Sequence, residues 1–278
     1  MVTGNEEMDK KPRVQVLVAA VNADVPVLVS KMNLQTDALI VNQCDHFGYE
    51  EFEHAGHGVR VFSMAERGVG LSRNTALMRS DGDILLFSDE DIRLEDGYEE
   101  KLQKGFAENP DADLLLFNLK VDPSRATYHN DSRHRVHWYN YGRYGIVEAA
   151  VRREALLRAN IGFSLLFGGG ARYSNGEDSL FFHDCLKKGL HVYTDTENIG
   201  EEILRESTWF HGYSEKFFYD RGVLYAYLYG WAAQLWTLRY LLAKKKVVCE
   251  QIPFAKALRL MRDGIREGRD VRRRESTD

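Results

Sequence analysis

The chain has 278 residues, of which 44% are hydrophobic and 28% are charged, so its composition excludes a disordered protein. Its 37 Lys and Arg against 42 Asp and Glu leave a net charge of −5, too small to indicate a nucleic-acid partner. The length predicts one large domain or two small ones. Three distant cysteines (Cys44, Cys185 and Cys249) and a polar N-terminus without a signal-peptide pattern favour a reducing, cytoplasmic compartment.

The first half of the chain alternates short apolar runs with helical patterns. Five runs are near-continuously apolar, as in strands buried on both faces of a parallel sheet: Val14–Ala20, Ala38–Gln43, Val59–Met64, Asp83–Ser88 and Asp113–Leu119. Three segments between them predict helices: Val25–Met32, Leu71–Arg79 and Tyr98–Ala107. This alternation predicts an open α/β sheet, which binds ligands at the carboxyl ends of its strands.

The second half is less regular. Residues Asp122–Tyr144, rich in Arg, His, Tyr and Asn, predict a surface loop or ribbon, and Ile146–Leu157 predicts a strand that runs into a helix. A glycine run, Gly168–Gly170, precedes a helix at Asp178–Lys188, a short strand HVYT and an apolar helix at Gly222–Leu238. We therefore divide the chain into a disordered segment (1–12), a first half (13–120), a second half (121–220) and C-terminal helices (221–278).

Three consecutive acids, Asp89, Glu90 and Asp91, follow the strand DILLFS. Carboxylates crowded at a strand end repel one another, and a divalent cation such as Mg²⁺ or Mn²⁺, shared with diphosphate oxygens, relieves that repulsion. A solvated acidic loop is the alternative, because the following residues continue acidic.

Upstream, Gly68 and Gly70 precede a helix that carries Ser72, Arg73 and Asn74 near its start. Helix N-termini attract anions, and an arginine there adds a bidentate phosphate ligand, so this turn is a candidate diphosphate site. A serine cap beside a surface arginine is the alternative. The chain contains neither a P-loop nor a dinucleotide fingerprint.

Further candidates lie at other strand and helix ends. Glu177 and Asp178 open a helix after the glycine-rich segment, where Asp178 is either a general base or a helix cap. His211 lies among aromatic residues, as a structural histidine or a ligand of a metal or diphosphate. Side chains at the ends of the first two strands are placed for a nucleotide base or for turns: Ala20, Asn22, Asn42 and Gln43.

Taken in order, these motifs resemble those of the family 2 glycosyltransferases, which have the GT-A fold. The matching segments are GVGLSRNTAL (Gly68–Leu77), GDILLFSDED (Gly82–Asp91) and GEDSLFF (Gly176–Phe182), and the resemblance covers roughly residues 14–219. It implies an α/β fold of GT-A (Rossmann-like) type, with a mixed, mostly parallel sheet flanked by helices and a C-terminal helical extension. In such a fold, residues 13–120 would be the nucleotide-sugar-binding half and residues 121–220 the acceptor-binding and catalytic half.

The resemblance implies roles for single residues. Asp89 and Asp91 correspond to the D-x-D that holds the metal, the ribose and the diphosphate, with Glu90 between them. Asp178 corresponds to the catalytic base and Glu177 to its partner. Arg73 and Asn74, at the start of their helix, correspond to residues that bind the nucleotide-sugar donor. His211 corresponds to a ligand of the metal or the diphosphate that lies far along the chain. Where the family often has an acidic pair after the second strand, this chain has Asn42 and Gln43, with Asp45 as the candidate substitute.

The implied reaction is inverting, metal-dependent transfer of a sugar from a nucleoside-diphosphate sugar, with UDP as the expected nucleotide, to a hydroxyl of a glycan or lipid-linked acceptor, as in surface polysaccharide synthesis. Two alternatives stay open: a non-catalytic sugar-nucleotide or glycan-binding module on the same fold, and a nucleotidyltransferase. The absence of a basic pyrophosphate loop after the first strand counts against the second. Tyr128–Tyr144 and the FGGGARY segment are the expected acceptor-binding regions.

The charge is unevenly distributed. Residues 244–278 carry 11 Lys and Arg against 6 Asp and Glu, a local net charge of +5, so the rest of the chain carries −10. This basic tail follows the apolar Gly222–Leu238 stretch, a combination suited to an interfacial membrane contact at the inner face of a membrane. Packing on the catalytic domain is the favoured alternative, and a homo-oligomer contact through 222–243 is another.

Overall fold

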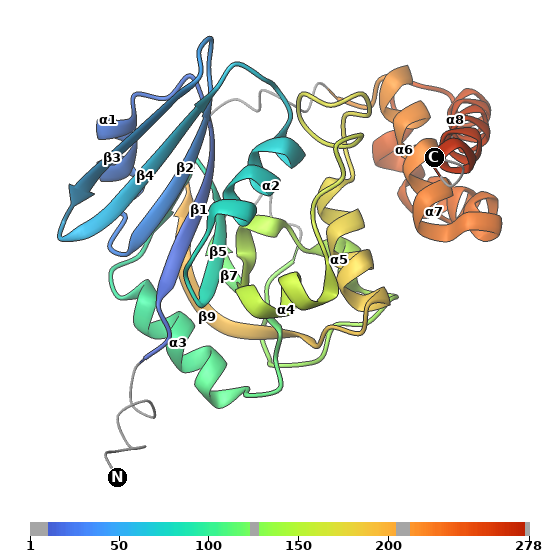
Figure 1. Ribbon diagram of the computed structural model, residues 1–278. Coiled ribbons are helices and arrows are strands. Elements are labelled where there is room, and N and C mark those ends of the chain that lie inside the picture. The colour runs from blue at the N-terminus through green and yellow to red at the C-terminus, as the bar shows by residue number, and fades with distance from the viewer. Residues whose placement is uncertain (1–10, 123–127, 204–211, 276–278) are drawn as a thin grey trace. The chain divides into compact units, whose positions relative to one another are not determined.

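The computed structural model describes residues 11–122, 128–203 and 212–275, so His211 and most of the expected disordered segment 1–12 lie outside the described residues (Figure 1). The chain divides into two compact units. The first comprises residues 1–67, 72–162 and 184–204, and the second comprises residues 68–71, 163–183 and 205–278. The predicted domain boundaries stay a prediction.

The first unit is built on one nine-stranded sheet with the strand order β3-β4-β2-β1-β5-β8-β7-β9-β6. The strands are β1 (Val14–Val21), β2 (Asp37–Gln43), β3 (Gly48–His54), β4 (His57–Met64), β5 (Ile84–Asp89), β6 (Ile92–Leu94), β7 (Leu114–Lys120), β8 (Ala149–Arg152) and β9 (Val192–Glu202). All five predicted apolar strands are present. The helices are α1 (Val25–Lys31), α2 (Val69–Arg79), α3 (Tyr98–Glu108), α4 (Arg153–Ala159) and α5 (Glu177–Lys187), and the unit boundaries fall within α2 and α5.

The α/β fold is confirmed, but the sheet is less parallel than expected. The pairs β1–β2, β1–β5, β2–β4 and β7–β9 are parallel, whereas β3–β4, β5–β8, β6–β9 and β7–β8 are antiparallel. Two of the antiparallel pairs involve β3 and β6, which escaped prediction, and the other two involve β8, a strand that the sequence predicted without indicating its direction. Strand β3 is an exposed edge strand of sequence GYEEFEH, and β6 has three residues, so neither has the apolar run of a buried strand.

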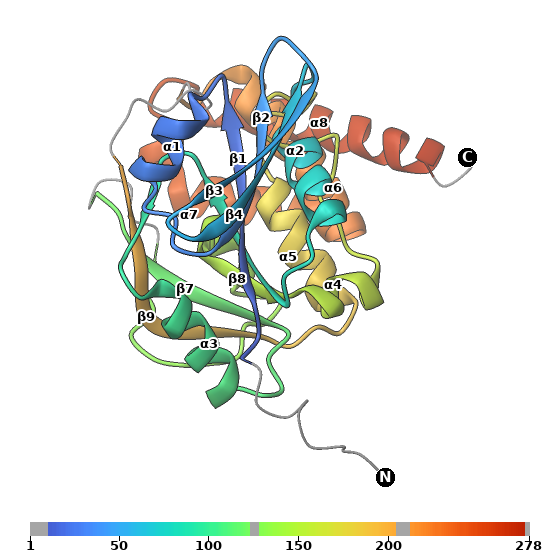
Figure 2. The same cartoon turned by 60° about the vertical axis from the view of Figure 1, so that its left-hand side comes forward.

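Helices cover both faces of the sheet (Figures 1 and 2). Alternate residues of β1, such as Val16 and Val18, pack with Leu28 of α1 and with Leu102 and Phe106 of α3 in one buried cluster. Successive strand side chains point to opposite faces, so the intervening Leu17 is buried toward the other face, where α2 and α4 lie. Burial on both faces leaves the strand ends as the places where polar side chains reach solvent.

The second unit contains the helices α6 (Glu215–Tyr229), α7 (Ala233–Val248) and α8 (Phe254–Glu275). Helices α6 and α8 cross closely, because a Cβ added at Gly222 would collide with the backbone of Met261, and one added at Gly264 would collide with that of Tyr219. The expected single helix over Gly222–Leu238 is wrong. Helix α6 ends before Gly230, whose φ of 53° and ψ of −116° are not helical. A 3-10 turn at Gly230–Ala232 then leads into α7.

No helix among the described residues combines the length and the apolarity that crossing a lipid bilayer requires.

Candidate nucleotide-sugar and catalytic residues

The carboxyl ends of the parallel strands β1, β2, β4 and β5 meet at one edge of the sheet. In the strand register, Ala20 pairs with Asn42 and Ala19 pairs with Asp89. This register brings together the residues predicted from separate strand ends, namely Ala20, Asn22, Asn42, Gln43 and Asp89. Such an edge is where open α/β sheets bind their ligands.

Asn42 ties the loop after β1 to the end of β2. Its Oδ1 accepts the Ala23 N–H at 3.0 Å, its Nδ2 donates to the Ala23 carbonyl at 3.0 Å, and its side chain is buried. Beside it, the Asn22 N–H donates to the Gln43 carbonyl at 3.1 Å, and Asn22 has a positive φ of 50°. Both asparagines therefore stabilise the turn between β1 and α1, and their contact with a nucleotide base stays a prediction.

Arg67, which the sequence analysis did not single out, reaches the same edge. Its Nη1 donates to the Gln43 carbonyl at 2.8 Å. The residue lies just beyond the carboxyl end of β4, so a cation follows the strand next to β2. In the sequence, Arg67 is marked only as a basic residue shortly after an apolar run. Many arginines and lysines fit that pattern, so the sequence alone does not identify Arg67 as a site residue.

The three acids at the end of β5, Asp89, Glu90 and Asp91, each have a different partner in the structure. Asp89 is paired with Arg73 of α2, whose Nη2 lies 3.1 Å from Oδ1 and 3.4 Å from Oδ2 of Asp89. The Oε2 of Glu90 accepts the Val21 N–H at 2.9 Å, and the Asp91 carbonyl accepts the Ile203 N–H at 2.7 Å. The acidic turn is therefore anchored to β1 and to the end of β9.

The Arg73–Asp89 pair places a buried cation beside a half-exposed carboxylate. The Arg73 side chain is 6% exposed and that of Asp89 is 36% exposed. A guanidinium held in this position balances part of the negative charge of the turn, and it lies where an anionic ligand at the sheet edge would meet it. The next residue, Asn74, fits closely against the chain, since a Cβ at Gly162 would lie 2.9 Å from its Oδ1.

Carboxylate oxygens of Asp89, Glu90 and Asp91 are the hard donors that Mg²⁺ and Mn²⁺ prefer, so the chemistry of the turn fits the predicted cation. Asp89 and Asp91 are the residues that would hold it. His211, the third expected ligand, lies outside the described residues.

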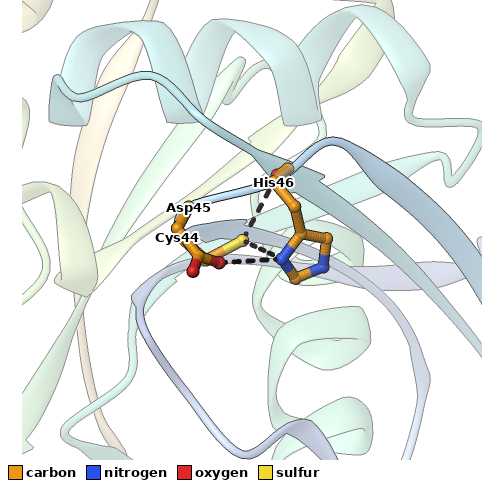
Figure 3. A group of neighbouring side chains, drawn as sticks. All are labelled: Cys44, Asp45 and His46. Atoms are coloured by element: carbon orange, nitrogen blue, oxygen red, sulfur yellow. Dashed lines mark hydrogen bonds and ion pairs between the residues drawn. The ribbon is translucent and has the colours of Figure 1, made fainter.

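A second polar group lies just beyond β2 and contains Asp45 (Figure 3). The Nδ1 of His46 lies 3.0 Å from Oδ1 of Asp45 and 3.5 Å from Sγ of Cys44. The hydrogen bond from His46 lowers the pKa of the Asp45 carboxyl. Among the described residues, this is the group whose Cys, His and carboxylate atoms come close enough to share a metal ion. Asp45 is exposed, so its expected role opposite a nucleotide base stays a prediction.

Glu177 and Asp178 belong to the second unit, where they form the first two residues of α5. Gly176, with φ 108°, turns the chain into this helix. A Cβ at Gly168, which has φ 103°, would lie 2.8 Å from Cδ of Glu177, so only glycine lets the carboxyl of Glu177 approach the glycine-rich loop. Asp178 is half-buried in the first turn of the helix.

The FGGGARY segment leads into a cavity of about 390 Å³ within the second unit. Asp220, which is buried, accepts the N–H and the Oγ–H of Ser174 at 2.8 and 2.7 Å. Lys216 donates to Asp220 at 2.7 Å and to the Arg172 carbonyl at 2.9 Å. The lining residues combine two tyrosine rings with charged side chains and one leucine: Arg172, Tyr173, Glu215, Lys216, Tyr219, Asp220 and Leu260.

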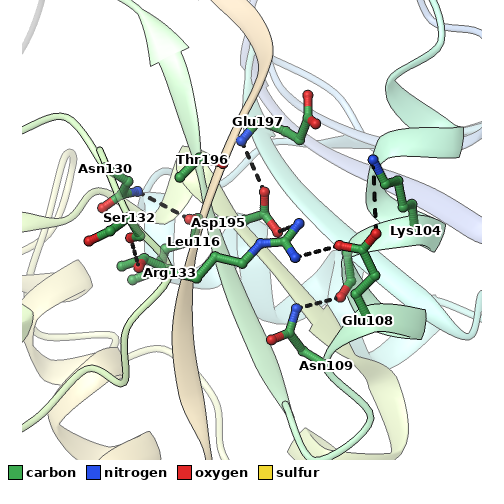
Figure 4. A network of polar contacts seen from close by, with 12 residues as sticks. Lys104, Glu108, Asn109, Leu116, Asn130, Ser132, Arg133, Asp195, Thr196 and Glu197 are labelled. Carbon is green, nitrogen blue, oxygen red and sulfur yellow. Dashed lines mark hydrogen bonds and ion pairs between the residues drawn. The ribbon is translucent and has the colours of Figure 1, made fainter.

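The other expected acceptor region, Tyr128–Tyr144, is anchored to the sheet (Figure 4). Arg133 lies between Glu108 of α3 and Asp195 of β9, with its Nη2 3.0 Å from Oδ2 of the fully buried Asp195. These partners raise the pKa of Arg133, and Arg133 lowers that of Glu108. The Asn130 N–H donates to Oδ1 of Asn118 at 2.8 Å. The described part of the segment is therefore a loop held against the sheet, which agrees with the surface-loop form of the prediction.

One family model matches part of the chain. Residues 48–163 match the family model described as Glycosyl transferase family 2. The matched range contains the Arg73 helix and the Asp89–Asp91 turn, whereas β1, β2 and the Glu177-Asp178 pair lie outside it. No curated protein matches the sequence significantly.

Solved structures share the fold. TarS 1-349 of S. aureus in complex with UDP-GlcNAc is 17% identical with a TM-score of 0.55, over 77% of this chain and 66% of that one. TarS 1-349 on its own is 12% identical with a TM-score of 0.57, over 92% and 83%. The Pyrobaculum calidifontis mannosyltransferase PcManGT, in complex with GDP-Man and Mn²⁺, is 14% identical with a TM-score of 0.50, over 94% and 88%.

This chain spans just under two thirds of the TarS chain that was solved with UDP-GlcNAc. At these identities the likeness shows the fold, and the family model supplies the link to glycosyltransferases. Together they confirm the predicted GT-A-like fold and the resemblance to family 2, and they support an enzyme of the glycosyltransferase class.

Proposed function

We propose that this chain, of which residues 48–163 match the family 2 glycosyltransferase model, transfers a sugar from a nucleoside-diphosphate sugar, with UDP as the nucleotide, to a hydroxyl of a glycan or lipid-linked acceptor in surface polysaccharide synthesis. The observation that carries the proposal is the sheet edge where Arg73 and the Asp89–Asp91 turn meet the ends of β1 and β2. Two of the structural relatives are complexes with UDP-GlcNAc and with GDP-Man and Mn²⁺, which supports a nucleotide-sugar as the donor.

We propose that the donor diphosphate lies at the Asp89–Asp91 turn. Asp89 and Asp91 would hold a divalent cation, which would neutralise charge on the leaving diphosphate. Arg73, released from part of its contact with Asp89, donates to diphosphate oxygens. Arg67 and the amide of Gln43 border the end of β2, on the side that the resemblance gives to the nucleotide base.

The proposed reaction is a single displacement with inversion at the anomeric carbon. The acceptor oxygen forms a bond to that carbon while the bond to the diphosphate oxygen breaks, and the nucleoside diphosphate leaves with the bonding electrons. The carboxylate of Asp178 takes the proton of the acceptor hydroxyl. Glu177, held against the Gly168 backbone, positions the start of α5.

The cavity beside the FGGGARY segment is the proposed place for the acceptor glycan. Its tyrosine rings offer flat apolar faces, and its charged groups offer hydrogen bonds, the combination that a carbohydrate surface needs. Replacing Tyr219 by Ala should raise the KM for the acceptor and leave the KM for the donor unchanged. An equal change in both constants would argue against acceptor binding there.

The decisive experiment replaces Asp178 by Asn and measures sugar transfer, donor hydrolysis and UDP binding with Mn²⁺ and a panel of nucleotide-sugars. Loss of a general base typically costs about 10²–10⁴-fold in rate, so transfer should fall by that factor while UDP binding persists. The matched control is Asp184→Asn, an acid further along the same helix, which should transfer normally.

A transfer rate near normal in Asp178→Asn would refute its role as base. Tight binding of a nucleotide-sugar without any transfer or hydrolysis by the unmodified protein would favour the non-catalytic binding module. Release of pyrophosphate from a nucleoside triphosphate would favour a nucleotidyltransferase.

A further inference from the structure

An apolar stripe runs along the solvent side of α7 and the turn before it. Leu235, Leu238 and Leu242 are 65%, 42% and 59% exposed, and Trp231 in the preceding 3-10 turn is 86% exposed. The three leucines are spaced three and four residues apart, so they share one face of the helix. Exposed apolar residues gathered in one line are unusual on a protein surface and mark contact sites.

The opposite face of α7 attaches the helix to its unit. Ala233, Thr237 and Leu241 are fully buried, and both Ala233 and Leu241 belong to the core cluster that includes Met261 and Ile265 of α8. The helix therefore packs through one face, and none of the three stripe leucines belongs to the core cluster.

The apolar stretch Gly222–Leu238, which the sequence predicted to be one helix, is divided between α6 and α7. Its first part, within α6, is core: Val223, Leu224 and Ala226 are buried in the same cluster. The exposed part begins after the break at Gly230. The question of a membrane contact thus concerns α7 and not the whole of Gly222–Leu238.

The charges on α7 have one sign. Its sequence, AQLWTLRYLLAKKKVV, contains Arg239, Lys244, Lys245 and Lys246 and no acidic residue. Arg239 follows Leu235 by four positions, and Lys245 follows Leu242 by three, so both cations flank the stripe. Long basic side chains beside apolar ones let the apolar groups enter an interface while the charges stay in the headgroup layer.

We propose that α7 docks on an anionic lipid surface, with the helix lying along the interface and the stripe from Trp231 to Leu242 entering it. The positive charge of α7 favours an anionic lipid surface over a second copy of the chain as the partner of this stripe. A two-fold contact would set the same patch against itself, bringing the four cations of each copy together. An anionic bilayer complements them. The proposal is independent of the sugar-transfer function, since it rests on none of the donor or catalytic residues.

The test is flotation of the full chain with vesicles of phosphatidylcholine alone or mixed with phosphatidylglycerol. Binding should require the anionic lipid and weaken as salt rises. The double variant Leu235→Ser/Leu238→Ser should lose flotation, and so should Lys244→Gln/Lys245→Gln/Lys246→Gln. The matched control is Leu157→Ser, a 49% exposed leucine on α4, which should float like the unmodified protein.

All five substituted positions of the two variants are exposed, so both should keep the circular dichroism spectrum of the unmodified chain. Flotation that is absent for the unmodified protein, or unchanged in both variants, would overturn the proposal. A dimer in ultracentrifugation that dissociates in Leu235→Ser/Leu238→Ser, without any vesicle binding, would show that the stripe joins two copies instead.

Discussion

Glu95, which follows β6, joins three separate elements and should contribute measurably to stability. Its carboxylate accepts hydrogen bonds from Lys101 of α3 at 2.7 Å, from Lys120 at the end of β7 at 2.6 Å and from Asn198 of β9 at 2.7 Å. Chiefly because of the two lysines, the pKa of Glu95 falls from 4.5 to about 2. We expect Glu95→Gln to destabilise the folded state above pH 5.

The magnitude follows from linkage between protonation and folding. The fall of the pKa from 4.5 to about 2 corresponds to about 3 kcal/mol, as an upper bound. The Lys120 side chain is 67% exposed and that of Glu95 is 28% exposed, so solvent screening reduces the expected loss to about 2 kcal/mol. Because the pKa is lower in the folded state, this stability is present above the unfolded value of about 4.5 and is lost as the pH falls toward 2.

Urea unfolding followed by circular dichroism at a series of pH values measures the effect. The unmodified protein should exceed Glu95→Gln in free energy of unfolding by about 2 kcal/mol at pH 7, and this difference should shrink steadily as the pH falls from about 4.5 toward 2. Glu100→Gln, an exposed glutamate on α3, serves as the control and should match the unmodified protein. A difference that is absent at pH 7, or that persists undiminished at pH 3, would refute the reasoning.

Three further predictions concern packing and burial. Gly264→Ala should destabilise the second unit by about 1–3 kcal/mol, seen as a lower urea midpoint, because its Cβ would meet the backbone of α6; an unchanged midpoint would show that the crossing relaxes. Asp195→Ala should lower the midpoint strongly by removing the buried end of the network in Figure 4, whereas Glu108→Gln at its exposed end should change little; equal effects would contradict the role of burial. Burial raises the pKa of the Cys185 thiol, so iodoacetamide followed by mass spectrometry should label Cys44 in the folded protein and spare Cys185.

The buried strands could be predicted because burial on both faces leaves a direct trace in the sequence. Val16 and Leu86 sit in uninterrupted apolar runs and are fully buried, as expected. Edge strands lack such an apolar run. Most side chains of β3 are exposed, so its sequence has the pattern of a polar loop. The helix break at Gly230 was missed because the apolar pattern continues on both sides of it.

The candidate site was predictable in its location and less so in its contacts. Strand ends fix where Asn42 and Asp89 lie, because the register of parallel strands brings their carboxyl ends to one edge. The partners of these side chains depend on distances across the fold that no local pattern encodes. Arg73 therefore proved to be paired with Asp89, and Glu90 with the backbone of Val21, although each had been expected to face a donor.

The proposal that a nucleoside diphosphate binds at the Asp89–Asp91 turn is tested most directly by calorimetric titration of UDP in the presence and absence of Mn²⁺. The account predicts binding that requires Mn²⁺ and that weakens at least about tenfold in Asp91→Asn, which removes a carboxylate ligand of the cation. Glu53→Gln, an acid on the distant edge strand β3, should bind UDP like the unmodified protein. Equal UDP affinity in Asp91→Asn and the unmodified protein, or binding indifferent to Mn²⁺, would contradict the account.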